Sequence, residues 1–328
     1  MTRIALRASN LLERTIGIPY PLAYPSAGRR FFRETKRADA VLIHDGLYLT
    51  SVAAALSAYW AGKPYIVVQH IGLVPYNNVL LRFLMSVANK VITRTVFKYA
   101  DQIVFISEVT QCYFADLECT RRPRLIFNGL DTTVFNPSGN DIEAIEARHR
   151  FDLPPSCPIA LFFGRFVEKK GLATLRILAR EHPDIIFAFA GWGAIDPSKW
   201  NLANVRVFTS LSGATLASLY RASSILVLPS AGEGFPLVIQ EALACGLPVL
   251  CGLETASADS SASSYVTGAP VDPRDPERTA QLFSQEMARL LAKPNTTAER
   301  MKRFEFAYSS YSWATAAEQY TNLLHKFT

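Results

Sequence analysis

The sequence predicts a two-domain α/β protein built on parallel sheets, and three observations support this prediction. The chain has 328 residues. A chain of this length usually folds around more than one hydrophobic core. Short apolar runs of strand length alternate with helical segments along it, a pattern typical of parallel sheets with crossover helices. Several runs stop at a glycine turn followed by a helix start. Such a turn presents free backbone amides and therefore favours an anion.

The first domain is predicted from a strand, a helix and a second strand at residues 40–44, 49–60 and 64–70. This spacing indicates a right-handed parallel unit. Ligands of such sheets bind beyond the carboxyl ends of the strands. His44 and His70 fall at two such ends, so we expect them on the ligand side of the sheet. A structural role is the alternative for a histidine at a strand end.

The front of the chain is basic. Residues 1–100, which open on a short strand at residues 4–6, carry 13 Lys and Arg against 4 Asp and Glu, whereas the whole chain has a net charge of +6. Residues 78–99 are predicted to form a helix whose apolar positions alternate with cations: Arg82, Lys90, Arg94 and Lys98. This helix is either docked on the sheet or lies on anionic lipid. Nucleic acid is disfavoured because no aromatic binding motif accompanies the charge.

The second domain is predicted to follow a polar hinge between about residues 137 and 157. Its first strand ends at Gly164, and the following turn carries three cations: Arg165, Lys169 and Lys170. A guanidinium can hold a phosphate with two hydrogen bonds, and a lysine adds a point charge. The turn therefore indicates a phosphate site, with a solvated charge run as the alternative.

A second turn of this kind organises the rest of the domain. An apolar strand at residues 225–229 leads into the turn at 230–234, and Pro236 can open a helix because its missing N–H costs nothing there. Gly246 ends that helix and a strand follows at residues 248–250. Strand, glycine turn, helix and strand make half of a nucleotide-binding unit.

Two carboxylates bracket this turn, Glu233 in the loop and Glu241 in the helix, with seven residues between them. A diphosphate repels carboxylates, so both are better suited to accept hydrogen bonds from the hydroxyls of a sugar nucleotide. The alternative is that Glu233 caps the helix and Glu241 is a solvated helix residue.

With Gly-Phe-Pro at 234–236 and Ala-Cys-Gly-Leu-Pro-Val at 244–249, the two glutamates resemble the E-x7-E motif of retaining glycosyltransferases of the family 4 type (group 1). Residues 126–137 resemble the interdomain stretch of that family, and residues 311–324 its closing helix. The resemblance thus covers nearly the whole chain.

The resemblance implies the GT-B fold, with two Rossmann-like domains facing each other across a cleft. Residues 1–150 would form the acceptor-side domain and residues 151–310 the domain that binds the nucleotide sugar. Residues 311–328 would form a helix that crosses back to the first domain.

The resemblance also implies an activity. The chain would move a hexose from a nucleotide-sugar donor to a saccharide or polyprenyl-diphosphate-linked acceptor, with retention of configuration and without a metal or cofactor. This would serve cell-surface polysaccharide or glycolipid synthesis in the cytoplasm, at the inner face of the membrane. The catalytic residues would be His70 and Glu233. The donor-binding residues would be Gly164, Arg165, Lys170, Gly234, Phe235, Pro236 and Glu241.

Each of these residues has an implied role. Arg165, Lys170 and the amides of Gly234 and Phe235 would meet the charge of the leaving diphosphate. Glu233 would hold hydroxyls of the donor sugar, and Glu241 would hold the ribose. His70 would lie near the reacting sugar.

The chain departs from the family pattern in two places. By the resemblance, a first strand, glycine loop and helix of roughly 30 residues, about one βα unit, would be expected before residue 4 and would be missing here. Residues 254–260 replace the usual Gly-Gly and acidic residue. Two alternatives therefore stay open: a nucleotide-sugar-binding protein without transferase activity, and a sugar-nucleotide isomerase in which water attacks the anomeric carbon.

Composition excludes other classes. Apolar content of 49% and charged content of 19% describe a globular chain rather than a disordered one. The five cysteines form no C-x-x-C pair, which favours a reducing compartment and no structural zinc. No G-x-G-x-x-G follows a strand, so an NAD-dependent oxidoreductase fits poorly.

Overall fold

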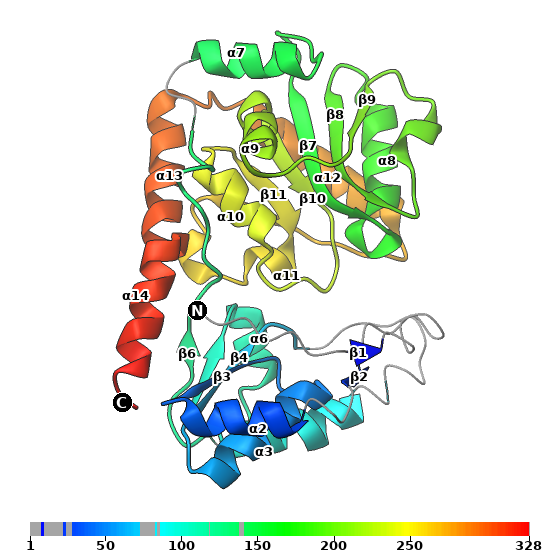
Figure 1. Cartoon of the computed structure of the whole chain (residues 1–328). Coiled ribbons are helices and arrows are strands. Elements are labelled where there is room, and N and C mark those ends of the chain that lie inside the picture. Colours follow the sequence, from blue (N-terminus) through cyan, green and yellow to red (C-terminus); the bar gives the residue numbers. More distant parts are fainter. Residues whose placement is uncertain are drawn as a thin grey trace. The chain divides into compact units, whose positions relative to one another are not determined.

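The computed structural model describes residues 8–9, 22–23, 28–72, 83, 86–117, 119–137 and 141–327. The predicted strand at 4–6, Arg82 and part of the predicted helix at 78–99 lie outside these residues. The chain divides into two compact units (Figure 1). Unit 1 combines Met1–Ile126 with Glu318–Thr328, and unit 2 comprises Phe127–Ala317.

Unit 1 holds a parallel four-stranded sheet in the order β3-β4-β5-β6. Its strands are β3 (Val41–His44), β4 (Tyr65–Gln69), β5 (Gln102–Phe105) and β6 (Arg124–Leu125). Two short strands pair antiparallel outside this sheet: β1 (Ala8–Ser9) and β2 (Leu22–Ala23). The helical segments are α2 (Gly28–Arg37), α3 (Leu49–Ala61), η2 (Asn89–Thr93), α5 (Arg94–Lys98) and α6 (Glu108–Tyr113).

The core of unit 1 lies on both faces of its sheet, because β4 is buried along its whole length. Successive strand residues point to opposite faces. Tyr65 and Val67 accordingly belong to one buried cluster with α3 and α5. Ile66 and Val68 belong to another, which Leu323 of the C-terminal segment completes. The last residues of the chain therefore cover the second face of this sheet.

Unit 2 holds a parallel six-stranded sheet in the order β12-β11-β10-β7-β8-β9. Its strands are β7 (Ile159–Phe166), β8 (Ile186–Gly193), β9 (Val205–Phe208), β10 (Ile225–Leu228), β11 (Val249–Gly252) and β12 (Val266–Ala269). The chain builds outward from β7 in one direction and then from β10 in the other. The order therefore reverses between β7 and β10, and such a reversal is where open α/β sheets bind ligands.

Helices cover both faces of this sheet (Figure 1). The described helices of unit 2 are α7 (Asp141–Arg150), α8 (Leu172–Glu181), α9 (Gly213–Ala222), α10 (Leu237–Ala244), α11 (Leu253–Ala256), α12 (Pro276–Leu291) and α13 (Thr297–Tyr311). Short 3-10 turns lie at Glu168–Lys170, Pro197–Trp200 and Ser260–Ala262. The final helix α14 (Trp313–Leu324) begins in unit 2 and ends in unit 1. Within the described residues no helix is long and apolar enough to cross a membrane.

Helix starts follow the local sequence. At α12 the Asp275 side chain accepts a hydrogen bond from the Arg278 amide at 2.9 Å, and Pro276 occupies the first turn. The described end of the predicted basic helix contains a π-turn at Asn89–Thr93. There Nδ2 of the Asn89 side chain donates to the Gly72 carbonyl at 3.1 Å, so this turn is tied to the loop after β4.

Candidate functional site

The candidate site of unit 2 lies where the loops after β7 and β10 meet. The Ala231 amide donates to the Lys169 carbonyl at 3.1 Å, which joins the two loops. Gly171 has a φ of +74°, and a Cβ there would lie 2.2 Å from the Pro229 carbonyl oxygen. Only glycine permits both this backbone and this close approach. The two loops predicted to bind phosphate and sugar are therefore neighbours at the switch point of the sheet.

The structure brings Glu233 and Lys170 into contact. Lys170 Nζ lies 2.8 Å from Glu233 Oε1, and Lys169 Nζ lies 4.0 Å from the same oxygen. The Glu233 side chain is 14% exposed, so this pair is partly shielded from water. Glu233 does not cap the following helix, whose N-cap is Pro236 and has no side-chain hydrogen bond. The loop carboxylate is therefore held by the cations of the neighbouring loop.

Arg165 has a different environment at the end of β7. It is exposed, and among the described residues no carboxylate lies within ion-pair distance of its guanidinium. Gly164 precedes it and pairs in register with Gly191 of β8. The guanidinium is thus available for an anionic ligand, whereas Lys170 already has an anionic partner.

The start of α10 is anchored through an aromatic ring. The Phe235 side chain is 2% exposed. Its ring lies 5.5 Å from that of Phe127 and 5.4 Å from that of Tyr311. Gly234 and Pro236 flank this buried ring, and Leu237 begins the helix. Burial of one side chain therefore fixes the backbone amides at this helix start.

Glu241 lies one helix length further on, half-buried against α9. Its Oε2 accepts a hydrogen bond from the Tyr220 hydroxyl at 2.8 Å. Burial raises the pKa of Glu241 above its ordinary value of 4.5, and the bond from Tyr220 opposes this rise only in part. Burial and the nearby Glu241 charge also raise the pKa of Tyr220. The alternative of a solvated helix glutamate does not describe this residue.

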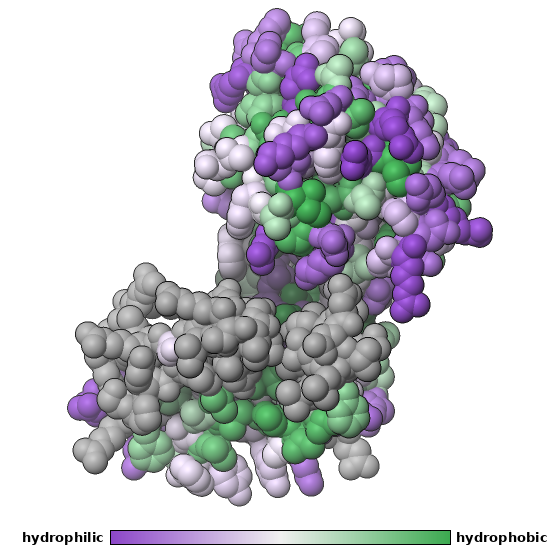
Figure 2. Space-filling model, turned by 90° about the vertical axis from the view of Figure 1, so that its right-hand side faces the viewer, coloured by the Kyte–Doolittle hydropathy of each residue, from purple (hydrophilic) through white to green (hydrophobic). Residues whose placement is uncertain are grey.

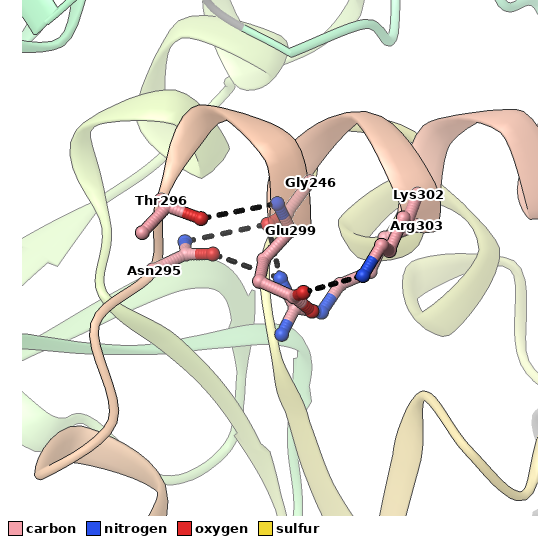
Figure 3. A network of polar contacts seen from close by, with 6 residues as sticks. All are labelled: Gly246, Asn295, Thr296, Glu299, Lys302 and Arg303. Atoms are coloured by element: carbon pink, nitrogen blue, oxygen red, sulfur yellow. Dashed lines mark hydrogen bonds and ion pairs between the residues drawn. The ribbon is translucent and has the colours of Figure 1, made fainter.

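The C-terminal end of α10 is held by a network that the sequence motifs do not reveal (Figure 3). The Gly246 carbonyl accepts bonds from the side chains of Asn295 and Arg303, both at 3.4 Å. Arg303 also donates to Asn295 Oδ1 at 2.8 Å. The Thr296 hydroxyl caps α13 by accepting from the Glu299 amide at 3.3 Å. The helix that carries Glu241 is therefore fastened to α13 at its far end.

In unit 1, His70 lies beside His44 at the carboxyl ends of β4 and β3. His44 Nδ1 and His70 Nε2 are 2.9 Å apart, so one ring donates and the other accepts. The His70 amide donates to Asp45 Oδ1 at 2.9 Å. Burial lowers the pKa of His70; the Asp45 charge opposes this and His44 adds to it. Within the described part of the chain, no group of three His, Cys, Asp or Glu residues could hold a metal ion.

Comparison with known proteins shows the family. Residues 7–134 match Glycosyltransferase Family 4, and residues 144–305 match Glycosyl transferases group 1. The chain therefore belongs to the group 1, or family 4, glycosyltransferases, as its motifs indicated.

Two curated relatives illustrate the range of the similarity. The D-inositol 3-phosphate glycosyltransferase of Segniliparus rotundus is 30% identical over 67% of this chain and 49% of its own length. The alpha-maltose-1-phosphate synthase of Mycolicibacterium smegmatis is 27% identical over 88% of this chain and 79% of its own length. The chain spans about half the length of the D-inositol 3-phosphate glycosyltransferases that it matches.

Solved structures show the same fold. Sucrose-phosphate synthase from Thermosynechococcus elongatus matches with a TM-score of 0.73 and 20% identity, over 98% of this chain and 82% of that chain. Anabaena Alr3699/HepE in complex with UDP matches with a TM-score of 0.71 and 16% identity, over 92% of this chain and 84% of that chain. The predicted α/β fold of the GT-B class, with two parallel sheets, is confirmed.

Proposed function

We propose that this chain transfers a hexose from a nucleoside-diphosphate sugar to an acceptor, with retention of configuration. The observation that carries the proposal is the meeting of two loops at the switch point of the unit 2 sheet. One supplies Arg165 and Lys170, and the other supplies Glu233 at 2.8 Å from Lys170. Cations suited to a diphosphate thus lie beside a carboxylate suited to sugar hydroxyls. UDP-glucose is the first donor to test, because Anabaena Alr3699/HepE was solved in complex with it.

The charges of the site suggest how the work is divided. Arg165 grips the diphosphate with two hydrogen bonds. Lys170 is shared between the diphosphate and Glu233, which keeps the carboxylate in place for the hydroxyls of the transferred sugar. The amides of Gly234 and Phe235 add stabilisation as negative charge grows on the leaving group. Glu241 accepts from the ribose hydroxyls.

Binding of UDP and pyrophosphate, with turnover of UDP-glucose, tests the proposal. Arg165→Ala should weaken diphosphate binding about tenfold or more, as loss of a charge-assisted hydrogen bond does, and should weaken UMP binding less. Glu233→Gln should lower kcat about 10- to 100-fold, or about 1.4–2.7 kcal/mol, with little change in UDP affinity. Arg180→Ala on α8 is the matched control. Equal losses for UDP and UMP would make Arg165 a general electrostatic contact rather than a clamp.

Product analysis separates the alternatives. Binding without turnover on any acceptor would indicate a nucleotide-sugar-binding protein. Release of a rearranged sugar or sugar nucleotide without a glycoside would indicate an isomerase. His70 is assigned to the transferred sugar by resemblance, and His70→Ala should reduce kcat while leaving UDP binding unchanged.

We further propose that the acceptor is lipid-linked or phosphorylated and that the chain works at the cytoplasmic face of an anionic membrane, in polysaccharide or glycolipid synthesis. The names of the relatives, which include an inositol 3-phosphate enzyme, support a charged acceptor. In unit 1, Lys90 and Lys98 are exposed. An apolar groove of about 460 Å³ lies beside them between α3 and α5.

The surface of unit 1 suits such a membrane. Figure 2 shows apolar side chains, in green, along its lower side. Exposed members of α3 include Leu56, Tyr59 and Trp60. Aromatic and cationic side chains together favour the interface of an anionic bilayer.

A further inference from the structure

A cationic cavity lies in unit 1, at the start of the edge strand β6. Its volume is about 610 Å³, which is enough for a small ligand. Four of the described residues that line this cationic cavity are basic and none is acidic: Arg121, Arg122, Arg124 and Lys326. All four are exposed. The cavity thus gathers positive charge at one place on the surface of unit 1.

These four cations have no anionic partner within the described part of the chain, where no carboxylate lies within ion-pair distance of any of them. Arg94 of the same unit differs, because Asp116 accepts two hydrogen bonds of 2.9 Å from it. Charges of one sign that line a cavity repel each other and raise the local concentration of counter-ions. The cationic cavity is therefore suited to an anion.

The loop before β6 is held against the sheet. Gln102 is 4% exposed, and its Nε2 donates to the Arg122 carbonyl at 2.9 Å. Arg124 is the first residue of β6 and pairs with β5. The Arg121 guanidinium lies 4.7 Å from the centre of the Phe327 ring, and that ring packs against a buried cluster of unit 1. The backbone that carries the three arginines is therefore fixed before a ligand binds, which lowers the entropy cost of binding.

The fourth cation comes from the other end of the chain. Lys326 follows α14. A second cavity of about 240 Å³ lies between α14 and β6 (Figure 1), and Lys326 and Arg124 line both cavities. A solvated run of charge is contiguous in sequence, whereas here folding adds a remote lysine to the arginines. An anion bound among the four cations would fasten the last residues of the chain to the sheet of unit 1.

The residue types indicate which anion fits. Guanidinium groups bind phosphate with paired hydrogen bonds, and a lysine adds a point charge. The cationic cavity lies at the edge where β5 and β6 begin, whereas His70 follows the carboxyl end of β4. We propose that this cavity is a second anion site, which binds the phosphate group of a soluble phosphorylated ligand or of a lipid headgroup. It is separate from the donor site proposed in unit 2 and does not depend on it.

Calorimetric titration of the full chain with inorganic pyrophosphate, at about 0.15 M salt, tests this site. Arg165→Ala serves as the parent protein, so that the proposed donor site contributes less. In that parent, Gln at Arg121, Arg122 and Arg124 (the triple arginine variant) should weaken pyrophosphate binding about tenfold or more, because charge-assisted hydrogen bonds are lost. Lys326→Gln should weaken it about threefold or more. This second variant changes an exposed residue near the chain end, so it tests the site even if the triple arginine variant does not fold.

The matched control removes the same charge elsewhere in unit 1. Gln at Arg33, Lys36 and Arg37, exposed cations of α2 that do not line the cavity, should leave pyrophosphate affinity unchanged. With Arg165 intact, the triple arginine variant should bind UDP as wild type does, which would show that its fold is preserved. If the control weakens pyrophosphate binding as much as the triple arginine variant does, the effect is general charge and the site is overturned.

Hydrogen exchange locates the bound anion. Pyrophosphate should slow amide exchange in residues 119–126 and 318–327 together, because both segments contribute cations to one site. Residues 28–37 of α2 should exchange at the same rate with and without pyrophosphate. Slowing in unit 2 alone would place every bound pyrophosphate at the donor site and would overturn the proposal for unit 1.

Sedimentation with vesicles separates the two sources of phosphate. Phosphatidylcholine vesicles that contain phosphatidic acid present a phosphomonoester, and vesicles with phosphatidylserine at matched surface charge are the comparison. A preference of wild type for phosphatidic acid, lost in the triple arginine variant, would assign the site to a lipid headgroup. Pyrophosphate binding without this preference would assign it to a soluble ligand. If the triple arginine variant and Lys326→Gln match their parent with both probes, the anion site is wrong while the donor site of unit 2 is unaffected.

Discussion

The glutamates of the E-x7-E stretch have different electrostatic surroundings although they lie in one short segment. Glu233 is neutralised by Lys170. Glu241 has a hydroxyl donor, Tyr220, but among the described residues no cation within ion-pair distance. Glu233 is therefore paired with a cation, whereas Glu241 is costly to ionise. Substitution of each glutamate by Gln should accordingly have a different effect.

Glu241→Gln should weaken UDP binding about tenfold, because a charged acceptor for the ribose is lost. It should also raise the thermal midpoint of the ligand-free protein at pH 7.5. The folded pKa of Glu241 lies above its unfolded value of 4.5, so its contribution to stability is present below pH 4.5 and is lost as pH rises through the folded pKa. Thermal scans at pH 4.5 and 7.5 measure this. A lower midpoint for the variant at pH 7.5 would contradict it.

The histidine pair of unit 1 makes a second prediction about charge. The folded pKa of His70 is lowered from its ordinary 6.5, so stability present above pH 6.5 should be lost as pH falls through the folded value. His44→Gln removes one cause of the shift and should move the His70 pKa upward. NMR titration of the His70 ring proton measures it. His182→Gln, which removes a bond to Ser284 in unit 2, is the control. A His70 titration that His44→Gln leaves unchanged would show that the rings do not interact.

Whole elements are placed by their ends. Helix α10 carries Glu241 and follows the loop that carries Glu233. The buried side chain of Phe235 anchors the start of this helix. Gly246, which follows the end of the helix, packs against α13. Contacts with α13 therefore help to fix the position of α10 and of the two carboxylates. The contacts join distant parts of the chain, since Arg303 donates to the carbonyl of Gly246.

Gly246→Ala should destabilise unit 2 by about 2 kcal/mol or more, because two costs combine. Gly246 has a φ of +74°, and its added Cβ would lie 2.7 Å from Arg300 Cβ. Gly213→Ala is the matched control, since Gly213 has a φ of +51° with nothing within 4 Å of an added Cβ. Gly213→Ala should cost only the free energy of placing a side chain on a left-handed backbone, about 1 kcal/mol. Urea unfolding of both variants measures the difference, and equal losses would show that the contact with α13 is not rigid.

The charge of the whole molecule is unevenly divided, and this bears on the membrane. The excess of positive charge lies in the first hundred residues, most of which belong to unit 1. Not all of these charges are free. Arg94 makes two hydrogen bonds of 2.9 Å to Asp116, and this contact lowers the pKa of that carboxyl. Arg94 should therefore contribute less to lipid binding than Lys90 or Lys98.

The protein should pellet with anionic liposomes at low salt and be released by about 0.5 M salt, where charges are screened beyond about 4 Å. Each basic residue near the surface contributes about 1 kcal/mol. The helix predicted at residues 78–99 has four basic residues, Arg82, Lys90, Arg94 and Lys98. Replacing all four with Gln should abolish pelleting without changing UDP binding.

The control for this experiment replaces as many charges in unit 2. Gln at Lys199, Arg206, Arg289 and Lys302 should leave pelleting unchanged. Equal recovery with neutral and anionic liposomes would overturn the electrostatic account and favour a soluble acceptor.

The sequence by itself determined the elements around the site, because local patterns specify them. The strand predicted at 225–229 is β10, the helix predicted to open at Pro236 is α10, and Gly246 follows its end as expected. Apolar run length, glycine turns and helix formers act over a few residues, so they can be read without the fold. The family motif, too, is contiguous in the chain.

Only the tertiary structure decided which residues meet. The pairs Lys170–Glu233, Tyr220–Glu241 and His44–His70 join residues from different loops or helices. Sheet order sets these meetings, because parallel pairing brings strand ends together that are remote in sequence. Burial, too, was decided only by the tertiary structure. Nothing local in the sequence shows that Glu241 is costly to ionise or that Trp192 stays exposed beside Arg165. Those properties arise from what packs around each side chain.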